Sequence, residues 1–291
     1  MRVLVTGARG MLGTELLLRQ PPGWFVAGVD LPDGDLSDAA TALRLVAAHE
    51  PQLVIHCAAW TDVDGCTREP ERALRLNGDV TRHVADACRA VGARLIAIST
   101  DYVFAGDLGR AYVEDDAPHP LNPYGESKLA GERAAAELPD HLIVRTQWLY
   151  GPAGKNFVAT IVNAARTRDK LRVVADETGS PTYVKDLADG LWQAAATDVT
   201  GTMHLTNSGA CSWYDLACHA TAAAGINIAI EPIPASEWNS PTVRPRYSPL
   251  ENRRWRELGF APLRPWQEAV AEFVREHLSG AENQIEEPAV P

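Results

Sequence analysis

The sequence predicts an α/β fold, a doubly wound parallel sheet followed by a smaller carboxyl-terminal lobe. Two observations support this fold class. Short apolar runs recur along the first half of the chain, and segments with helical spacing separate them; the runs lie at residues 2–6, 24–30, 53–57, 93–99 and 142–145. The runs are continuous rather than alternating, which is typical of strands buried on both faces of a parallel sheet.

Composition and charge restrict the classes of function. The chain has 291 residues, of which 46% are hydrophobic and 22% charged, as in an ordinary globular enzyme. Its formal net charge of -11 argues against a nucleic-acid-binding surface or an anionic membrane surface. No apolar run approaches the roughly 20 residues of a membrane span.

The cysteines and histidines indicate a reduced protein without a metal. The 5 cysteines include no C-x-x-C pair, and the 8 histidines show no ligand spacing. The chain begins directly with a strand, without a signal-peptide pattern. We therefore expect reduced thiols, no metal and a cytoplasmic location.

A glycine-rich turn follows the first strand. Gly7, Gly10 and Gly13 come directly after Arg2–Thr6, and Met11–Arg19 then has the spacing of a helix. Gly7 permits a tight turn, Gly10 lets the backbone approach a pyrophosphate, and Gly13 allows close packing of helix on strand. Together they predict a site for the pyrophosphate of a dinucleotide at the helix N-terminus. A plain tight turn is the alternative interpretation.

Two residues near this turn give opposite indications about the cofactor. Asp30 ends the second strand, where a carboxylate can bond the ribose hydroxyl of NADH. Arg9 lies inside the glycine turn, where a guanidinium group suits the 2′-phosphate of NADPH. We therefore expect NADPH or NADH, without a choice between them. Asp35 and Leu36 are expected to flank the adenine, and Asp38 has N-capping of the next helix as its alternative role.

The third strand is followed by Ala58, Ala59 and Trp60. Ligands of doubly wound sheets bind at the carboxyl ends of the strands, and the two small residues leave room for a cofactor. Trp60 is expected to cover the cofactor or the substrate, or else to be a tryptophan of the core or rim. A long helix is expected over Pro70–Val91, in which Asn77 interrupts the apolar face, either as a satisfied buried amide or as a brace for the site.

Polar residues suited to catalysis follow the fourth strand. Thr100 and Asp101 lie at its carboxyl end, and Tyr124 and Lys128 are four residues apart, so on a helix they share one face. A phenol has an ordinary pKa of about 10, and a nearby ammonium group lowers that pKa. The set suits proton transfer to a carbonyl oxygen while a hydride arrives at its carbon. Taken alone, the Tyr-Lys spacing also fits an ordinary helix start after Pro123.

Together these segments resemble the extended short-chain dehydrogenase/reductase superfamily, whose fold is Rossmann-like, and within it the dTDP-4-dehydrorhamnose reductase family. The resemblance runs from Val3 to about Phe273, nearly the whole chain. The motifs that carry it are Thr6-Gly7-Ala8-Arg9-Gly10-Met11-Leu12-Gly13, Cys57-Ala58-Ala59-Trp60-Thr61-Asp62-Val63-Asp64, Ser99-Thr100-Asp101-Tyr102-Val103-Phe104, Tyr124-Gly125-Glu126-Ser127-Lys128, Arg145-Thr146-Gln147-Trp148-Leu149-Tyr150 and Gly179-Ser180-Pro181-Thr182.

The resemblance implies which residues carry the reaction. It implies Tyr124 as the general acid, Lys128 as the residue that lowers the pKa of Tyr124 and holds the ribose, and Thr100 as their assistant. The positions that match cofactor contacts are Gly10, Met11, Leu12, Asp35, Leu36, Ala58, Ala59 and Trp60. The positions that match contacts to the sugar nucleotide are Thr100, Asp101 and Trp148.

The chain departs from the family pattern at two positions. Trp60 stands where the family often has His or Tyr, and Gln147 stands where a small residue is usual. Both positions are expected where the substrate lies, so the exact sugar stays open.

The second half of the chain is expected to form the substrate lobe. Leu171–Val174 is expected as the sixth strand, and Ile228–Pro249, with its prolines, as an irregular segment. Arg244 lies in that segment, and because guanidinium groups suit phosphate oxygens, we expect it to meet the nucleotide diphosphate. The alternative is a surface pair with Glu251. Glu15, on the first helix, is expected to face outward rather than to bind a divalent ion.

The domain boundaries follow from this division. Residues 1–150 are expected to form mainly the dinucleotide-binding domain, and residues 151–278 the sixth strand and the substrate lobe. Residues 279–291 have no apolar period and are expected to form a disordered tail.

The predicted reaction is NAD(P)H-dependent reduction of the C4 ketone of a dTDP-6-deoxy-4-keto sugar, foremost of dTDP-4-dehydro-L-rhamnose to dTDP-L-rhamnose. One alternative is a 4-ketoreductase for a different dTDP-deoxysugar in a natural-product pathway. Another is a nucleotide-binding regulatory subunit without turnover. The expected partner is the dTDP-sugar substrate; the sequence does not fix the oligomeric state, for which a homodimer is one option, or the configuration at C4.

Overall fold

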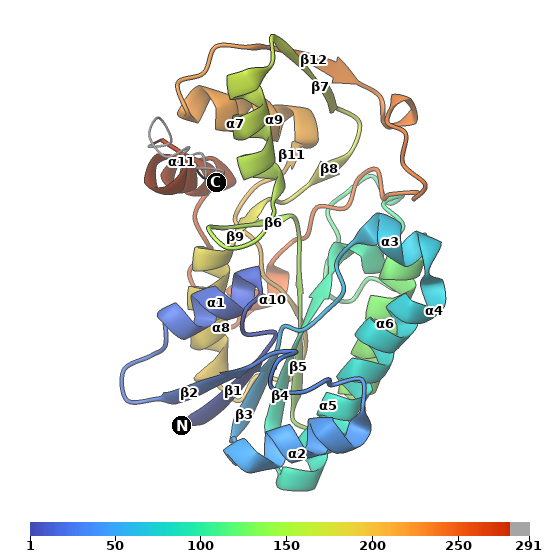
Figure 1. The fold of residues 1–291 in the computed structure, drawn as a ribbon, viewed down its shortest axis with the longest axis vertical. Helices are drawn as coiled ribbons and strands as arrows, with labels where there is room; N and C mark the ends of the chain where they lie inside the picture. Colours follow the sequence, from blue (N-terminus) through green and yellow to red (C-terminus); the bar gives the residue numbers. More distant parts are fainter. Residues whose placement is uncertain (280–291) are drawn as a thin grey trace, which may run out of the picture.

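Six parallel strands form the main sheet of the computed structural model, which describes residues 1–279 (Figure 1). Their spatial order is β10 (Gly201–His204), β5 (His141–Thr146), β4 (Arg94–Thr100), β3 (Leu53–His56), β1 (Arg2–Thr6) and β2 (Phe25–Val29). Every neighbouring pair is parallel. The chain order reverses between β1 and β3, and this switch point is where doubly wound sheets bind ligands.

Helices cover both faces of this sheet (Figure 1). On one face lie α1 (Met11–Leu18) and α8 (Val184–Ala195), which pack against each other. On the other face lie α2 (Ala39–His49), α5 (Val80–Val91) and α6 (Pro123–Ala136). Because both faces are covered, β3 is buried along its whole length, as its continuous apolar run predicts.

The helix predicted over Pro70–Val91 is confirmed, with a difference in its middle. After α3 (Val63–Arg68), the chain continues through α4 (Pro70–Ala73), the π-helical turn η1 (Leu74–Asp79) and α5. A π-helical turn inside an α-helix is wider than its neighbours and is frequent at functional sites. Here it carries Asn77, whose contacts are described below.

The smaller lobe contains three short two-stranded sheets. They pair β6 (Leu149–Tyr150) with β9 (Thr182–Tyr183), β8 (Thr178–Gly179) with β11 (Cys211–Ser212), and β7 (Lys170–Val174) with β12 (Ala229–Ile233). The remaining elements are η2 (Asp101–Val103), α7 (Phe157–Thr167), α9 (Trp213–Ala223), η3 (Ala235–Glu237), α10 (Arg253–Glu257) and α11 (Trp266–His277).

Two expectations about the lobe need correction. The strand expected at 171–174 exists as β7, but it pairs with β12, and the sixth strand of the main sheet is β10. The burial of β7 gives the reason, because Leu171 and Val173 are buried while Lys170 and Arg172 are exposed, which fits a sheet with one solvated face. The segment expected to be irregular contains β12, so that expectation is wrong over its first residues.

The larger hydrophobic core extends from the sheet through α8 to the lobe helices α9 and α11. It includes Leu16 of α1, Leu191 of α8, Leu216 of α9 and Phe273 of α11. The boundary at residue 150 stays a prediction. From residue 280 onward, the expected disordered tail lies outside the described residues.

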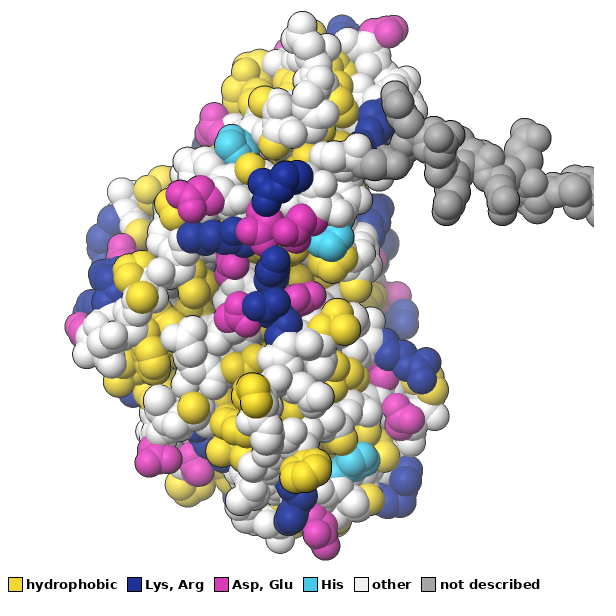
Figure 2. All heavy atoms as spheres, turned by 90° about the vertical axis from the view of Figure 1, so that its left-hand side faces the viewer, with side chains coloured by type: hydrophobic (Ala, Val, Ile, Leu, Met, Phe, Trp, Pro, Cys, Tyr) yellow, Lys and Arg dark blue, Asp and Glu magenta, His cyan; other side chains and the backbone are white. Residues whose placement is uncertain are grey.

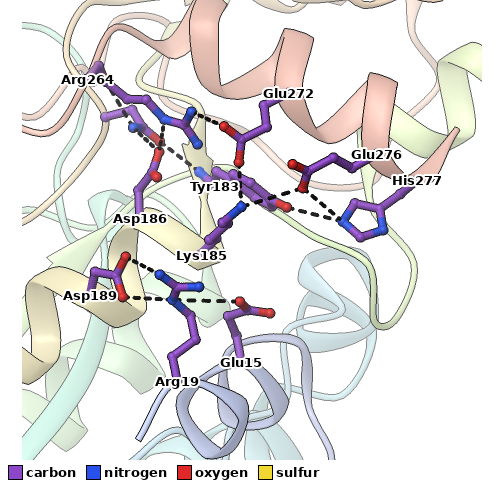
Figure 3. A network of polar contacts seen from close by, with 11 residues as sticks. Glu15, Arg19, Tyr183, Lys185, Asp186, Asp189, Arg264, Glu272, Glu276 and His277 are labelled. Atoms are coloured by element: carbon purple, nitrogen blue, oxygen red, sulfur yellow. Dashed lines mark hydrogen bonds and ion pairs between the residues drawn. The ribbon is translucent and has the colours of Figure 1, made fainter. Parts of the chain in front are cut away.

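Two groups of ion pairs connect α8 with α1 and with α11 on the left-hand side of Figure 1 (Figure 3). Arg19 pairs with Glu15 at 3.9 Å and with Asp189 at 2.5 Å. The expectation that Glu15 faces outward is wrong, because α8 covers α1 and leaves Glu15 only 8% exposed. This burial raises the pKa of the Glu15 carboxyl, and Arg19 opposes the shift.

The second group of ion pairs connects α8 with the last helix. Lys185 of α8 pairs with Glu272 of α11 at 2.6 Å, and Arg264 pairs with Glu272 and with Asp186, the latter at 2.9 Å. Figure 2 shows the acidic and basic side chains mixed in a band across this face. Within residues 1–279, no group of three or more His, Cys, Asp or Glu side chains has an arrangement that could hold a metal ion.

Two further findings concern the described part of the chain. None of the helices within residues 1–279 is both long and apolar enough to span a membrane. All five cysteines lie in this part, and all are free thiols, as expected.

Candidate active site

Two adjoining cavities lie along the carboxyl ends of the sheet strands. The first, of about 450 Å³, contains Arg9, Asp30 and Trp60 in its lining. The second, of about 380 Å³, contains Tyr124 and Lys128. Both are lined by Gly7, Gly10, Cys57 and Ala59, so they form one continuous groove past the glycine turn. An elongated ligand therefore fits with one end in each cavity.

The glycine turn packs so closely on neighbouring backbone that two of its positions require glycine. Gly7 has φ 67°, and a Cβ there would lie 2.6 Å from the amide nitrogen of Ala58. A Cβ on Gly13 would lie 2.2 Å from the carbonyl oxygen of Gly7, so the predicted close packing at Gly13 is confirmed. Neither position accepts a side chain without movement of the backbone.

The N-terminus of α1 is open to an anion. Gly10 is its N-cap residue, no side chain caps it, and the first turn has no acidic residue. The first-turn amide groups, which include those of Met11 and Leu12, point toward the groove end of the helix, where its dipole is positive. Uncapped N–H groups beside Gly7 fit the pyrophosphate of a dinucleotide.

The residues expected at the adenosine end line the first cavity. The carboxylate of Asp30 accepts hydrogen bonds from the backbone N–H groups of Arg9 and Leu31, each at 2.8 Å. Asp30 is thus held at the cavity wall beside the glycine turn, and Asp35 and Leu36 lie in the same wall, together with Ala58.

Asp38 has the alternative role that the sequence offered. It is the N-cap of α2, and its carboxylate accepts from the backbone N–H of Thr41 at 2.9 Å. Hydrogen bonding with the Thr41 side chain, and then with its backbone N–H, lowers the pKa of the Asp38 carboxyl.

Trp60 lies on the side of the first cavity and does not line the second. Its backbone N–H donates to Asn77 Oδ1 at 2.7 Å, and its carbonyl oxygen accepts from Asn77 Nδ2 at 3.1 Å. Asn77 Nδ2 also donates to Ser127 Oγ at 3.0 Å. Asn77 is therefore a satisfied amide and a brace at once, and the guanidinium of Arg72 stacks over the Trp60 ring at 4.6 Å. The expectation that Trp60 lies where the substrate does is not supported by this placement.

The Tyr-Lys pair lies on α6 as predicted. Asn122 caps this helix by accepting from the Gly125 N–H at 3.0 Å, and Pro123 occupies its first turn. Tyr124 and Lys128 are both buried and both line the second cavity. The helix therefore presents the phenol and the ammonium group to the same space.

Burial is the main cause of the pKa shifts of this pair. Lys128 Nζ donates to the carbonyl oxygen of Ile98 at 2.8 Å, and burial lowers the pKa of Lys128 to about 8. Burial raises the pKa of Tyr124 above its ordinary value, the charge of Asp101 raises it further, and a hydrogen bond with the Thr100 side chain opposes both. Lys128 is not among the groups that shift the pKa of Tyr124 here, so its pKa-lowering role and its ribose contact stay predictions.

Asp101 lies beside this pair at the end of β4 and is 1% exposed. Its Oδ2 accepts from Gln147 Nε2 at 2.6 Å and from Ser248 Oγ at 2.7 Å, and its Oδ1 accepts from Thr100 Oγ1 at 3.1 Å. Gln147 Oε1 also accepts from the Ser180 N–H at 2.6 Å. Gln147, where the chain departs from the family pattern, thus connects Asp101 at the end of β4 with Ser180 of the lobe through its side-chain amide.

The far wall of the second cavity consists of two stacked tryptophans. The rings of Trp148 and Trp213 lie 3.4 Å apart with an interplanar angle of 11°. Trp148 has φ 48°, a left-handed conformation that is costly for a bulky residue and is typical of functional sites. The sequence indicated Trp148 only through the family resemblance and did not indicate Trp213, because its partner is distant along the chain.

Arg244 lies in the lobe, near but not in the second cavity. Its Nη2 pairs with Asp64 at 2.8 Å, and it lines a separate cavity of about 260 Å³ with Glu177 and Trp213. The alternative pairing with Glu251 is not found, since Glu251 pairs with Arg256. The expected contact of Arg244 with the diphosphate stays a prediction.

The glycine turn suits a dinucleotide, and its groove continues to the buried Tyr124, Lys128 and Thr100. This arrangement defines a nicotinamide-dependent oxidoreductase that acts on a carbonyl group. Comparison with known proteins narrows this class. The family model described as RmlD substrate binding domain matches residues 1–279. A dTDP-4-dehydrorhamnose reductase of Streptomyces griseus is 45% identical over 280 residues, which cover 93% of this chain and 92% of that protein. A dTDP-4-keto-6-deoxy-D-glucose reductase of Streptomyces niveus is 37% identical over 279 residues, 93% and 96% of the two chains.

The fold agrees with a solved structure. The crystal structure of dTDP-4-dehydrorhamnose reductase from Bacillus anthracis, in complex with NADP, has a TM-score of 0.92 at 38% identity and covers 94% of this chain and 99% of that one. This chain therefore belongs to the dTDP-4-dehydrorhamnose reductase family, NAD(P)H-dependent sugar-nucleotide 4-ketoreductases within the extended short-chain dehydrogenases/reductases. The predicted fold class is confirmed, and the predicted type of cofactor agrees with the NADP that is bound in the structure of the Bacillus anthracis relative.

Proposed function

We propose that this protein reduces the C4 ketone of a dTDP-6-deoxy-4-keto sugar, and that its substrate is dTDP-4-dehydro-L-rhamnose, which becomes dTDP-L-rhamnose. The observation that carries the proposal is the position of Tyr124. Its phenol is buried beside Thr100 in the cavity that continues from the glycine cradle. The Streptomyces griseus and Bacillus anthracis relatives, both named dTDP-4-dehydrorhamnose reductases, support the choice of sugar.

Different residues of the chain bind the cofactor and transfer the proton in this reaction. A nicotinamide cofactor, when bound along the two cavities, supplies the hydride for the C4 carbon. Gly7 and the open N-terminus of α1 hold its pyrophosphate, and Asp30 and Arg9 face its adenosine ribose. Tyr124 donates its proton to the C4 oxygen, and Thr100 supports that oxygen by hydrogen bonding.

The surroundings of the substrate follow from the second cavity. The stacked Trp148 and Trp213 form an apolar wall, and Thr100 and Asp101 line the same cavity. Arg244 lines the neighbouring lobe cavity, where its guanidinium suits the diphosphate of the substrate. The low water content of such a buried site strengthens each polar contact to the sugar.

A second candidate function is a 4-ketoreductase for another dTDP-deoxysugar. The Streptomyces niveus relative, named dTDP-4-keto-6-deoxy-D-glucose reductase, favours it, as does the amide of Gln147 in the cavity wall. The third candidate, a regulatory subunit, would bind the cofactor and reduce nothing; the intact Thr100, Tyr124 and Lys128 argue against it.

The test is oxidation of NADPH and of NADH, followed by absorbance, with a panel of dTDP-4-keto sugars. The proposal predicts the highest kcat/KM with dTDP-4-dehydro-L-rhamnose. A higher value with another sugar would favour the second candidate, and cofactor binding without turnover on any sugar would favour the third.

The role of Tyr124 is tested with a matched pair of variants. Tyr124→Phe should bind the cofactor normally and lose roughly 10²–10⁴-fold in kcat, the usual contribution of a general acid. Tyr150→Phe is the control, because Tyr150 is also buried, has no partner for its hydroxyl and lies outside both cavities. Wild-type kcat in Tyr124→Phe would contradict the mechanism.

A further inference from the structure

The arrangement around Asp101 suggests a function for this carboxyl group that the reaction above leaves open. After Tyr124 gives its proton to the sugar, a phenolate remains in a buried site. Lys128 Nζ donates to the Ile98 carbonyl at 2.8 Å. The Thr100 hydroxyl, in contrast, donates to Asp101 Oδ1 at 3.1 Å and lies with Tyr124 in the lining of the second cavity, where the Thr100 side chain lowers the pKa of the phenol.

The two oxygens of Asp101 have different surroundings. Oδ2 accepts two hydrogen bonds, from Gln147 Nε2 at 2.6 Å and from Ser248 Oγ at 2.7 Å. Oδ1 accepts a hydrogen bond from the Thr100 hydroxyl at 3.1 Å. Because Oδ2 already has two donors, a proton on this carboxyl group belongs on Oδ1, directed at Thr100.

We propose that Asp101 is a proton reservoir that restores the proton of Tyr124 through the Thr100 hydroxyl, and that Gln147 and Ser248 are positioning residues which keep Asp101 Oδ1 directed at Thr100. The inference rests on the proposed function, since it concerns the same reduction. It gives a role to Gln147, whose amide reaches Asp101 from the end of β5, and to Ser248, which reaches it from the lobe.

Three proton transfers complete the reaction and restore Tyr124. The Tyr124 O–H bond breaks as the new O–H bond of the sugar alcohol forms. The Thr100 proton then moves to the Tyr124 oxygen, and the proton on Asp101 Oδ1 moves to Thr100 Oγ1. The net change is that Asp101 passes from carboxylic acid to carboxylate, and it takes up a proton from water after the product leaves.

The electrostatics of the site agree with this direction of transfer. Burial raises the pKa of Asp101 to about 6, so the acid form is present in the range where the ordinary Asp is ionised. The hydrogen-bond partners of Asp101 are all neutral, and none of the ion pairs within residues 1–279 involves it. The titratable groups that face it are Tyr102 from its own turn and Tyr124 from α6, and its charge raises the pKa of both. A protonated Asp101 therefore also makes Tyr124 the better proton donor.

The first test is Asp101→Asn. Asn can offer Oδ1 to Gln147 and Ser248 and an N–H to Thr100, so it copies the hydrogen bonds of the acid form but has no proton to give. A reservoir predicts that kcat at pH 5.5 falls by roughly 10²-fold, near the lower limit for loss of acid-base help, with unchanged affinity for NADPH. It also predicts that the decline of kcat above pH 6 in the wild type disappears in the variant. A purely structural or electrostatic role predicts no fall, because the variant removes the charge that holds the Tyr124 proton. Wild-type kcat with the same inflection would overturn the proposal.

The second test does not depend on the sugar. Carboxyl ¹³C NMR of the enzyme without substrate follows the ionisation of Asp101, whose signal is identified by its loss in Asp101→Asn. Ser248→Ala removes a bond that favours the ionised form, so the inflection should move to higher pH. Thr221→Val is the matched control: it also removes a buried lobe hydroxyl, which donates to the Ala217 carbonyl on α9, and it should leave the inflection in place.

These outcomes separate the two hypotheses. If the wild type reduces no 4-keto sugar, the proposed function fails, and the NMR titration still tests the reservoir. If Asp101 titrates near its ordinary value, or Ser248→Ala leaves its inflection unmoved, the reservoir fails while the reductase activity stands.

Discussion

Replacing Glu132 by Gln should destabilise this protein strongly, because Glu132 forms a buried ion pair below the active site. Arg145 donates to both of its carboxylate oxygens, from Nε at 2.8 Å and from Nη2 at 2.7 Å. The two side chains are 6% and 5% exposed, and Ser99 Oγ donates to the same carboxylate at 2.6 Å. Glu132 lies on α6 one turn after Lys128, so the pair fastens the catalytic helix to β5.

The expected loss in the free energy of unfolding follows from the burial of this ion pair. Removing one partner of a buried pair leaves an uncompensated charge and costs about 3–5 kcal/mol. Arg145 Nη1 already lacks a hydrogen-bond partner, so the guanidinium has little means of compensation. Gln retains one acceptor oxygen, which places the expected loss near the lower limit, about 3 kcal/mol. For a chain of this size, that loss lowers Tm by roughly 6–12 °C.

The assay is thermal and urea unfolding of three variants. Glu132→Gln should show the full loss. Glu132→Met combined with Arg145→Met removes both charges and should recover at least half of it. Glu137→Gln breaks an exposed pair with Arg82, whose side chains are 53% and 46% exposed, and should cost less than about 1 kcal/mol. A loss in Glu132→Gln no larger than that of Glu137→Gln would refute the reasoning. Glu132 also raises the pKa of Lys128, so in Glu132→Gln the pKa of Lys128 should fall below about 8.

Three other predictions concern the cofactor and pH. Gly7→Ala should abolish NADPH binding in a fluorescence titration, since its Cβ would lie 2.6 Å from the Ala58 nitrogen; Gly109→Ala, at φ 65° with open space around it, is the control and should bind normally. Arg9→Ala should raise the KM for NADPH at least tenfold, roughly the value of one charge-assisted contact to a phosphate, and leave that for NADH nearly unchanged; an equal effect on both would show that Arg9 does not meet the 2′-phosphate. Burial lowers the pKa of His56 to about 3, so the unfolded state binds a proton that the folded state does not, and the free energy of unfolding should fall as pH falls from 6.5 toward 3. In His56→Gln, the free energy of unfolding measured in urea should fall less steeply over that range. An unchanged slope would contradict the lowered pKa of His56.

Local sequence patterns predicted the elements that lie within one segment of the chain. The glycine turn, the uncapped start of α1 and the Tyr124-Lys128 face of α6 depend on residues a few positions apart, and spacing alone describes them. The order of the main sheet was less accessible, because the four-residue strand β10 and the five-residue strand β7 look alike until their partners are known.

Contacts between distant segments could not be predicted. Glu15 looked exposed because the helix that covers it, α8, comes much later in the chain. Gln147 was recognised only as an unusual residue, and the hydroxyl of Ser248 that meets the same carboxylate lies 101 positions away. The sign of the pKa shift of Tyr124 depends on burial and on Asp101, neither of which spacing reveals.

The edge position of β10 affects how the chain is made and how it can be divided. During synthesis, β5 stays unpaired on one side until the ribosome has released the chain beyond His204, because its neighbour Gly201–His204 is encoded after the helices α7 and α8. An open strand edge of this kind invites pairing with other chains. A fragment of the protein that ends near residue 150 would lack β10 and would leave this edge of β5 unpaired. The nucleotide-binding half is therefore not a module that can be exchanged by cutting the gene at its middle.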